Sequence, residues 1–137
     1  MRTETPRPFG WWWQKFLQNV PHPSDATFSE FEEMYYDPCR GFMCWMLTAG
    51  MKEIFITKCC GDGRYWRDKA FEMFRWAQEH YGVQYMIVCA YRNPEAYCRL
   101  FKCDLWKTEE RHGKNALLVP SEGGEIDGWR RNFLSHG

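Results

Sequence analysis

The sequence lacks the marks of a nucleic-acid binder and of a membrane protein. Eighteen Lys plus Arg residues balance eighteen Asp plus Glu residues, so the formal net charge is zero. Dedicated nucleic-acid binders normally carry a basic surplus that neutralises phosphates. The basic clusters that do occur, at 64–69 and at 130–131, lie beside carboxylates, which favours solvated faces. No apolar run approaches the ~20 residues that cross a bilayer.

The cysteines lack a pattern that would indicate a disulfide framework or a metal centre. There are seven, an odd number, and none form a CxxC pair. The opening residues, MRTETPRPFG, do not contain the apolar core of a secretory signal. Free thiols in a reducing cytoplasm therefore fit best. A zinc site from Cys98, Cys103 and His112 has no standard ligand spacing, so we predict no metal.

Aromatic residues are abundant, at 18% of the chain with eight tryptophans. Each buried aromatic side chain removes roughly 150–250 Å² from water, so they can fill the core of a small domain. Core filling is favoured over base stacking. The 137 residues suit one domain, 1–137, with an aromatic, proline-rich leader at 1–23 and an irregular tail at 121–137.

The leader contains an amphipathic segment, Trp11–Leu17. Its apolar side would consist of Trp12, Trp13, Phe16 and Leu17 if it is helical. Such a helix either packs onto the domain or offers a surface to a partner protein or a membrane.

The remaining sequence predicts alternating helices and strands. Ser24 and Asp25 are candidate caps for a helix at 26–36. Runs at 42–48 and 53–57 predict an antiparallel hairpin. A loop at 58–63 then precedes a long helix. That helix is expected at 65–81, with a C-cap at Gly82. Its buried stripe would consist of Ala70, Phe71, Phe74, Ala77 and Tyr81, widened by Met73, Trp76 and His80.

After the long helix we expect a buried strand at 83–91 and a helix from Asn93 to about Cys103. Further strands would begin near 105 and 116.

The loop before the long helix is a candidate anion site. A helix N-terminus offers unpaired amides and the positive end of its dipole, and glycine lets a phosphate approach the backbone. Gly61 and Gly63 would supply that access. Taken alone, the two glycines fit a simple turn equally well.

The following half of the pattern strengthens the case. Asn93-Pro94-Glu95-Ala96 followed by Leu100-Phe101-Lys102-Cys103-Asp104-Leu105-Trp106 resembles the GNAT acetyltransferase superfamily, in which this helix starts at Asn and ends in Leu-Tyr before Gly-Phe. The resemblance spans roughly Lys52 to Trp106. It implies an α/β fold whose mixed central sheet is flanked by helices.

The same resemblance implies acetyl-CoA as cofactor and an amine, on a small molecule or a protein, as acceptor. The coenzyme would lie between strands near Ile56 and Val88, with Asn93 and Phe101 beside it. Amides from the loop would hold its pyrophosphate, and these belong to Cys60, Gly61, Asp62, Gly63 and Arg64. Acetyl would pass directly to the amine. Glu53 is the candidate base acting through water.

Several residues depart from the family pattern. Phe101 stands where many members have the tyrosine that protonates the thiolate, so Tyr97 is the candidate acid. Leu105 replaces the usual glycine. The loop also has two registers: either Lys58 takes the Gln/Arg place and Gly61 and Gly63 are the family glycines, or the loop spans 61–66 and Arg64 and Trp66 stand at glycine positions.

The front of the fold is short compared with the two helices and three antiparallel strands usual before the loop strand. A small chain with an altered cofactor loop is similar to acetyltransferase-like proteins of tailed bacteriophages.

Two hypotheses about function follow. The chain is an N-acetyltransferase, or it is a non-enzymatic protein, structural or partner-binding through Trp11–Leu17, in a virion or the host cytoplasm. A homodimer could supply a missing strand. No sequence neighbour activates Cys59 or Cys60 for a covalent route.

Overall fold

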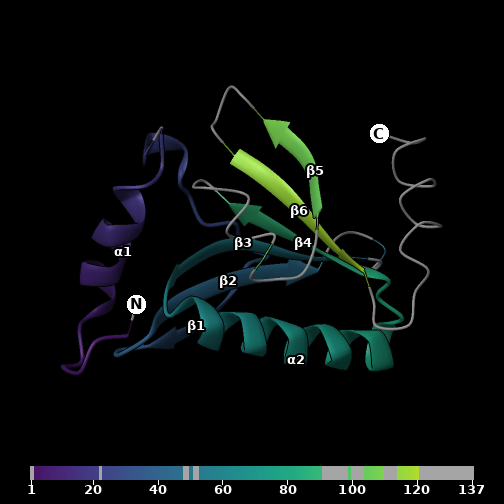
Figure 1. The fold of residues 1–137 in the computed structure, drawn as a ribbon, viewed down its shortest axis with the longest axis horizontal. Coiled ribbons are helices and arrows are strands. Elements are labelled where there is room, and N and C mark those ends of the chain that lie inside the picture. Colours follow the sequence, from purple (N-terminus) through teal and green to yellow (C-terminus); the bar gives the residue numbers. More distant parts are fainter. Residues whose placement is uncertain are drawn as a thin grey trace.

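A computed structural model describes residues 2–21, 23–47, 50, 53–90, 99, 104–109 and 114–120. The elements follow in the order α1 (Phe9–Leu17), the 3₁₀ turn η1 (Pro23–Asp25), β1 (Glu33–Asp37), β2 (Gly41–Leu47), β3 (Glu53–Gly61), α2 (Gly63–Tyr81), β4 (Tyr85–Ala90), β5 (Asp104–Glu109) and β6 (Lys114–Pro120). In Figure 1, α2 runs along one side of the sheet and α1 stands at its left-hand end.

The strands form one mixed sheet in the order β1-β2-β3-β4-β6-β5. Neighbours pair antiparallel except for β3 and β4, which are parallel and joined through α2. A parallel pair needs a crossover of this kind, whereas antiparallel neighbours need only a turn. The predicted α/β fold, with a mixed central sheet and flanking helices, is confirmed.

Helix α2 forms where its periodicity predicted it. The Asp62 side chain caps its start and Gly82, at φ 68°, ends it in the left-handed conformation. Its buried stripe faces a core shared with β2, β3 and β4. Ala70, Met73, Phe74 and Ala77 are buried as predicted. The stripe also contains Trp66, which was not predicted, while Trp76, His80 and Tyr81 are exposed.

Helix α1 packs on the opposite face of the sheet. Trp12 is fully buried and Phe16 nearly so, against Phe42 and Cys44 of β2. The Trp12 indole also donates to the Pro38 carbonyl at 3.0 Å. The interpretation of this segment as a helix that packs onto the domain is therefore confirmed.

The predicted helix at 26–36 is wrong. Residues 26–32 form no helix, and strand β1 begins at Glu33. Phe28, Phe31 and Met34 have helical spacing, but pairing with β2 places Tyr35 opposite Met43. Tertiary pairing overrides local preference in a segment this short.

The prediction that few elements precede β3 is confirmed, although the elements differ from those predicted. One helix and two strands precede β3: the helix is α1, and β1 is the strand that the sequence did not predict.

The strand expected at 83–91 is confirmed as β4, with Met86, Ile87, Val88 and Cys89 all buried. The helix expected from Asn93 and the tail lie outside the described residues. Within the described part, no helix is long and apolar enough to cross a membrane.

Candidate functional site

A β-bulge in β3 lies where its pairing with β4 ends. Opposite β2, Cys44 pairs with Lys58 and Trp45 with Ile56, so Thr57 is the extra residue. The parallel partners run from Glu53 and Tyr85 to Ile56 and Val88, and β3 then continues to Gly61. The bulge thus separates the half of β3 that pairs with both β2 and β4 from the half that pairs with β2 and leads to α2.

The connection from β3 to α2 is a single residue, which corrects the loop predicted at 58–63. Strand β3 extends through Gly61, and α2 begins at Gly63. Between them Asp62 accepts a hydrogen bond from the Tyr65 amide through Oδ1, at 3.3 Å. The register that needs a loop through Trp66 does not fit, because Trp66 lies within α2 and is buried.

The start of α2 is hydrogen-bonded to the turn before β2. The Arg40 carbonyl accepts from the Asp62 amide at 2.9 Å and from the Trp66 indole at 2.7 Å. Gly41 and Gly61 oppose each other here with φ of 102° and 116°, and a Cβ on either would lie about 2 Å from a backbone carbonyl oxygen. Gly61 therefore serves the contact between β2 and β3.

Lys58 is not available to an incoming phosphate. Its ammonium is buried and lies 2.8 Å from Glu32 Oε2. The ammonium also bonds Glu32 Oε1 at 2.9 Å, and the Thr57 hydroxyl donates to Oε2 at 3.1 Å. The bulge brings the Thr57 and Lys58 side chains to the same carboxylate.

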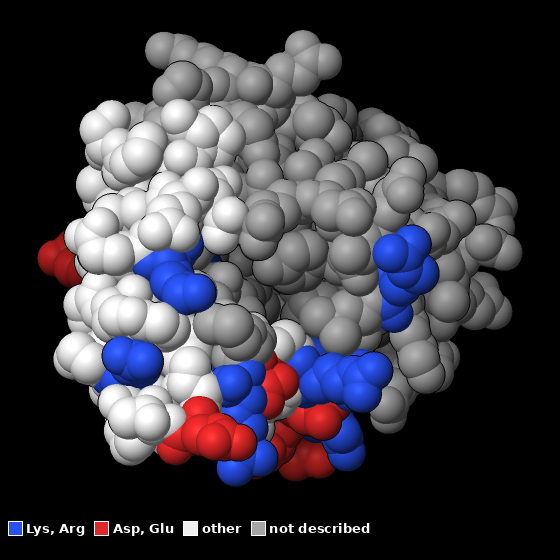
Figure 2. All heavy atoms as spheres, turned by 60° about the vertical axis from the view of Figure 1, so that its left-hand side comes forward, with Lys and Arg blue, Asp and Glu red and all other residues white. Residues whose placement is uncertain are grey.

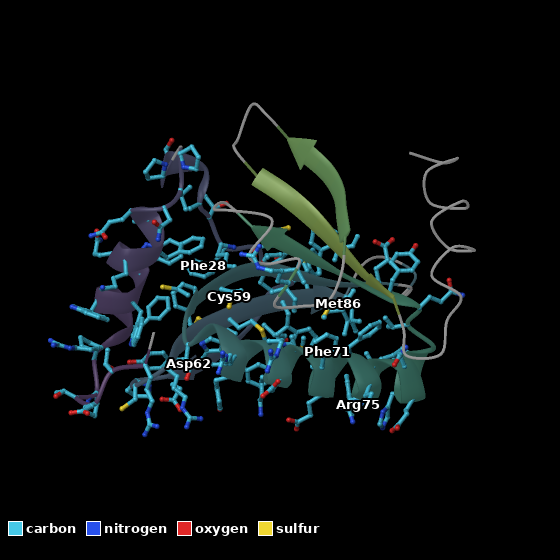
Figure 3. The ribbon with its side chains drawn as sticks, viewed as in Figure 1. Phe28, Cys59, Asp62, Phe71, Arg75 and Met86 are labelled. Atoms are coloured by element: carbon cyan, nitrogen blue, oxygen red, sulfur yellow. The ribbon has the colours of Figure 1, made fainter. Side chains whose placement is uncertain are left out.

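The charge around the helix start is mixed. Asp62 lies at the beginning of α2 and Arg75 on its outer side, further along (Figure 3). Arg64 is exposed, and the Arg40 guanidinium lies 4.2 Å from the centre of the Tyr65 ring. In Figure 2, basic and acidic side chains are interspersed along the lower rim of the molecule, where α2 runs. No surface of one sign is formed there.

The residues at the start of α2 fit the pyrophosphate of a coenzyme that binds weakly. The first amides of a helix have no intrahelical acceptor, which leaves those of Gly63 and Arg64 for a pyrophosphate. The amides of Asp62 and Tyr65 already have protein partners. The Asp62 carboxylate supplies a negative charge at the positive end of the helix dipole, which lowers the affinity for a second anion.

Glu53, the predicted base, is the first residue of β3 and lies opposite Tyr85. Desolvation by burial raises the pKa of Glu53, and a hydrogen bond from Tyr85 partly offsets the rise. Burial and the neighbouring Glu53 charge raise the pKa of Tyr85 in turn. Sequence reasoning missed Tyr85, because only the register between β3 and β4 makes the two residues neighbours.

The thiols near the site are weak nucleophiles. Burial raises the pKa of Cys59 to about 12, and that of Cys44 also to about 12. Burial raises the pKa of Cys60 as well, against the opposing effect of nearby positive charge. Because a thiolate is the reacting form, a covalent route through Cys59 or Cys60 is disfavoured.

The structure brings together part of the predicted site. Ile56 and Val88 are paired and buried, and Cys60, Gly61, Asp62, Gly63 and Arg64 lie where β3 passes into α2. Asn93, Tyr97 and Phe101 lie outside the described residues, as do the zinc candidates Cys98, Cys103 and His112. Among the described side chains, no group of three or more His, Cys, Asp or Glu could hold a metal.

Comparison with known proteins gives no family assignment. The sequence matches no protein-family model and no curated protein. The fold is similar to that of the solved ribosomal-protein-S18-alanine N-acetyltransferase from Escherichia coli, with a TM-score of 0.48 and 12% sequence identity, over 92% of this chain and 98% of that chain. Similarity of this degree carries no information about substrate or activity.

Proposed function

We propose that the chain is an acetyl-CoA-dependent N-acetyltransferase-like protein with weak affinity for its coenzyme. The observation that carries the proposal is the parallel pair β3 and β4, joined through Asp62 and α2, whose pairing ends at Ile56 and Val88 beside the Thr57 bulge. An elongated arm could lie between two strands that part at this point. The start of α2 lies at the end of the same strand.

Each residue has a separate role in this proposal. Ile56 and Val88 flank the arm, and the amides of Gly63 and Arg64 bind the pyrophosphate. The coenzyme supplies an acetyl thioester, which an amine nitrogen attacks at the carbonyl carbon as the C–S bond breaks. Glu53 takes the amine proton through water, and the rise in its pKa that burial causes makes it a stronger base than an exposed carboxylate. The departing thiolate needs a proton, the role predicted for Tyr97.

A second function is favoured by the Asp62 carboxylate. A helix that carries its own anion at its start is already satisfied without a ligand. Lys58, too, is committed to Glu32. These features suit a non-enzymatic protein that kept the fold and binds a partner, either in a bacteriophage particle or in the cytoplasm of a host.

Calorimetric titration with acetyl-CoA separates the two functions. Asp62→Asn keeps the helix cap, since Asn and Asp cap equally well, but removes the charge. We expect it to tighten binding about tenfold. Arg64→Glu should weaken binding about tenfold. Arg75→Glu makes the same charge change at an exposed position further along α2 and should leave affinity unchanged.

Gly61 is unsuitable for this test, because any side chain there collides with the Arg40 carbonyl and disturbs the sheet. Saturable binding that follows the order Asp62→Asn, wild type, Arg64→Glu would support the coenzyme site and justify a screen of amine acceptors with Glu53→Gln. Absence of heat for both wild type and Asp62→Asn up to millimolar ligand would leave the non-enzymatic function.

A further inference from the structure

A groove unrelated to the coenzyme site lies between α2 and the first two strands. Its volume is about 250 Å³, and it is lined by Tyr35, Trp45, Lys69, Glu72, Met73 and Trp76. Tyr35 and Trp45 stack with ring centres 6.3 Å apart. Trp76 on the opposite wall is 41% exposed. The groove thus offers aromatic surfaces on two sides and one carboxylate.

The groove opens beside an edge of the sheet. In the described part of the sheet, β1 is the terminal strand and pairs with β2 on one side. Met34, Tyr35 and Tyr36 of β1 are 45%, 38% and 39% exposed. Phe28 and Phe31, just before the strand, are also exposed. A strand edge with exposed apolar side chains is a template for pairing with another extended chain.

The charge of this edge indicates what kind of chain would pair with it. Residues 24–37 contain no Lys or Arg. Apart from Glu32, which is buried and paired with Lys58, the acids are Asp25, Glu30, Glu33 and Asp37. An antiparallel pair of two copies centred on Tyr35 would place Glu33 opposite Asp37 twice. Like charges directly opposite each other destabilise a strand pair. The edge therefore favours a basic partner over a second copy.

We propose that the edge of β1 binds an extended peptide of another protein in which basic and apolar residues alternate. Main-chain hydrogen bonds would add the peptide to the sheet, as in other cases of strand addition. On one face its basic side chains would lie beside Glu33 and reach the groove, where Glu72 and the Trp76 ring attract a cation. On the other face its apolar side chains would lie beside Met34 and Tyr36.

The groove already contains a cation of the protein itself, on the Tyr35 side. The Lys69 ammonium lies 5.2 Å from the centre of the Tyr35 ring. This contact shows that the Tyr35 ring accepts a cation, and it also makes Lys69 a competitor of the peptide. Removing Lys69 should therefore strengthen binding, an effect that a merely supporting residue would not have.

The test uses the whole chain and three fluorescein-labelled decapeptides at about 0.15 M salt, where exposed charges are partly screened. The first alternates Lys and Val, the second alternates Glu and Val, and the third is the Lys-Val peptide N-methylated at alternate residues, which removes its hydrogen-bond donors on one edge. Fluorescence anisotropy should show saturable binding of the first peptide and at least tenfold weaker binding of the other two.

Protein variants locate the site. Glu33→Lys should weaken binding of the Lys-Val peptide about tenfold, and Lys69→Ala should strengthen it several-fold. Glu4→Lys makes the same charge change at an exposed residue that belongs neither to β1 nor to the lining of the groove, and should leave affinity unchanged. Equal binding of the Lys-Val and Glu-Val peptides, equal binding of the N-methylated peptide, or equal loss in Glu33→Lys and Glu4→Lys would each overturn the proposal. None of these measurements involves acetyl-CoA, so the proposal stands apart from the proposed function.

Discussion

The Lys58 ammonium and the Glu32 carboxylate form a buried ion pair, 2.8 Å apart, with side chains only 6% and 8% exposed. The pair joins the centre of the sheet to the segment just before β1. Both charges have left water, so each depends on the other, and the Thr57 hydroxyl satisfies the carboxylate further. Breaking such a pair is costly, while replacing both partners can be nearly neutral.

Removing one partner of this pair should destabilise the chain strongly. We expect Glu32→Gln to lower the free energy of unfolding by about 3–5 kcal/mol, because the Lys58 charge stays buried. The double variant Glu32→Gln, Lys58→Met should recover a large part of that loss. Urea unfolding of the wild type, both single variants and the double variant measures the coupling. A loss below about 1 kcal/mol for Glu32→Gln would show that the ammonium finds water instead.

The facing glycines of β2 and β3 should tolerate no side chain. Gly61→Ala places a Cβ 2.0 Å from the Arg40 carbonyl oxygen in a backbone conformation with φ of 116°. We expect a loss of about 3 kcal/mol or more from strain and displaced strands. Gly10→Ala is the matched control, since that glycine lies in α1 with open space around it and should gain about 0.5–1 kcal/mol. Thermal unfolding compares the two variants.

The thiols of Cys44 and Cys59 should resist alkylation. With the pKa of Cys44 and of Cys59 raised from 9.0 to about 12, the thiolate fraction at pH 8 is about a thousandfold below that of an unperturbed thiol. Iodoacetamide labelling at pH 8, followed by peptide mass spectrometry, should show slow modification of both residues in the native chain. The same residues should react rapidly in 8 M urea. Rapid labelling of native Cys59 would reopen the covalent route.

The pH dependence of stability should contain a contribution from Glu53. Its pKa in the folded chain lies above the ordinary value of 4.5, mainly because burial disfavours the carboxylate. Below about pH 4 the group is protonated in both states, and the destabilising effect of its charge appears as pH rises through the folded pKa. Glu53→Gln should therefore unfold at higher urea than wild type at pH 7, and this difference should shrink towards pH 4. The exposed Glu30→Gln serves as the control, and an unchanged difference at both pH values would contradict the assignment.

The sequence predicts elements whose signals lie within one continuous segment. Helix α2 has a helical period with Gly82 after it, and its end at Tyr81 is where the sequence predicts it. Its start at Gly63 lies slightly before the predicted start at Tyr65, because Asp62 caps it. Strand β4 is a buried apolar run, which needs no partner to be recognised. Strand β1 is different, because it is short and exposed. Its identity depends on pairing with β2 and on a Glu32–Lys58 contact between residues 26 positions apart.

Some features of the candidate site are likewise predictable from one continuous segment, while others depend on contacts between distant segments. The sequence predicts a helix start near the end of β3, but it predicts neither the single-residue connection at Asp62 nor the role of Gly61. Gly61 suits a phosphate-binding turn as well as it suits a close strand contact, and only the Gly41 backbone opposite decides between them. The Glu53–Tyr85 neighbourhood likewise exists only through the register of β3 and β4.

The position of α1 has a consequence for the order of events during protein synthesis. Helix α1 leaves the ribosome before every surface on which it packs, and its contact with Cys60 spans 48 positions of the chain. Trp12 and Phe16 therefore cannot be buried against the sheet until β2 and β3 have emerged. Through that interval an apolar helix face is open to chaperones, and the nascent chain is at its greatest risk of aggregation.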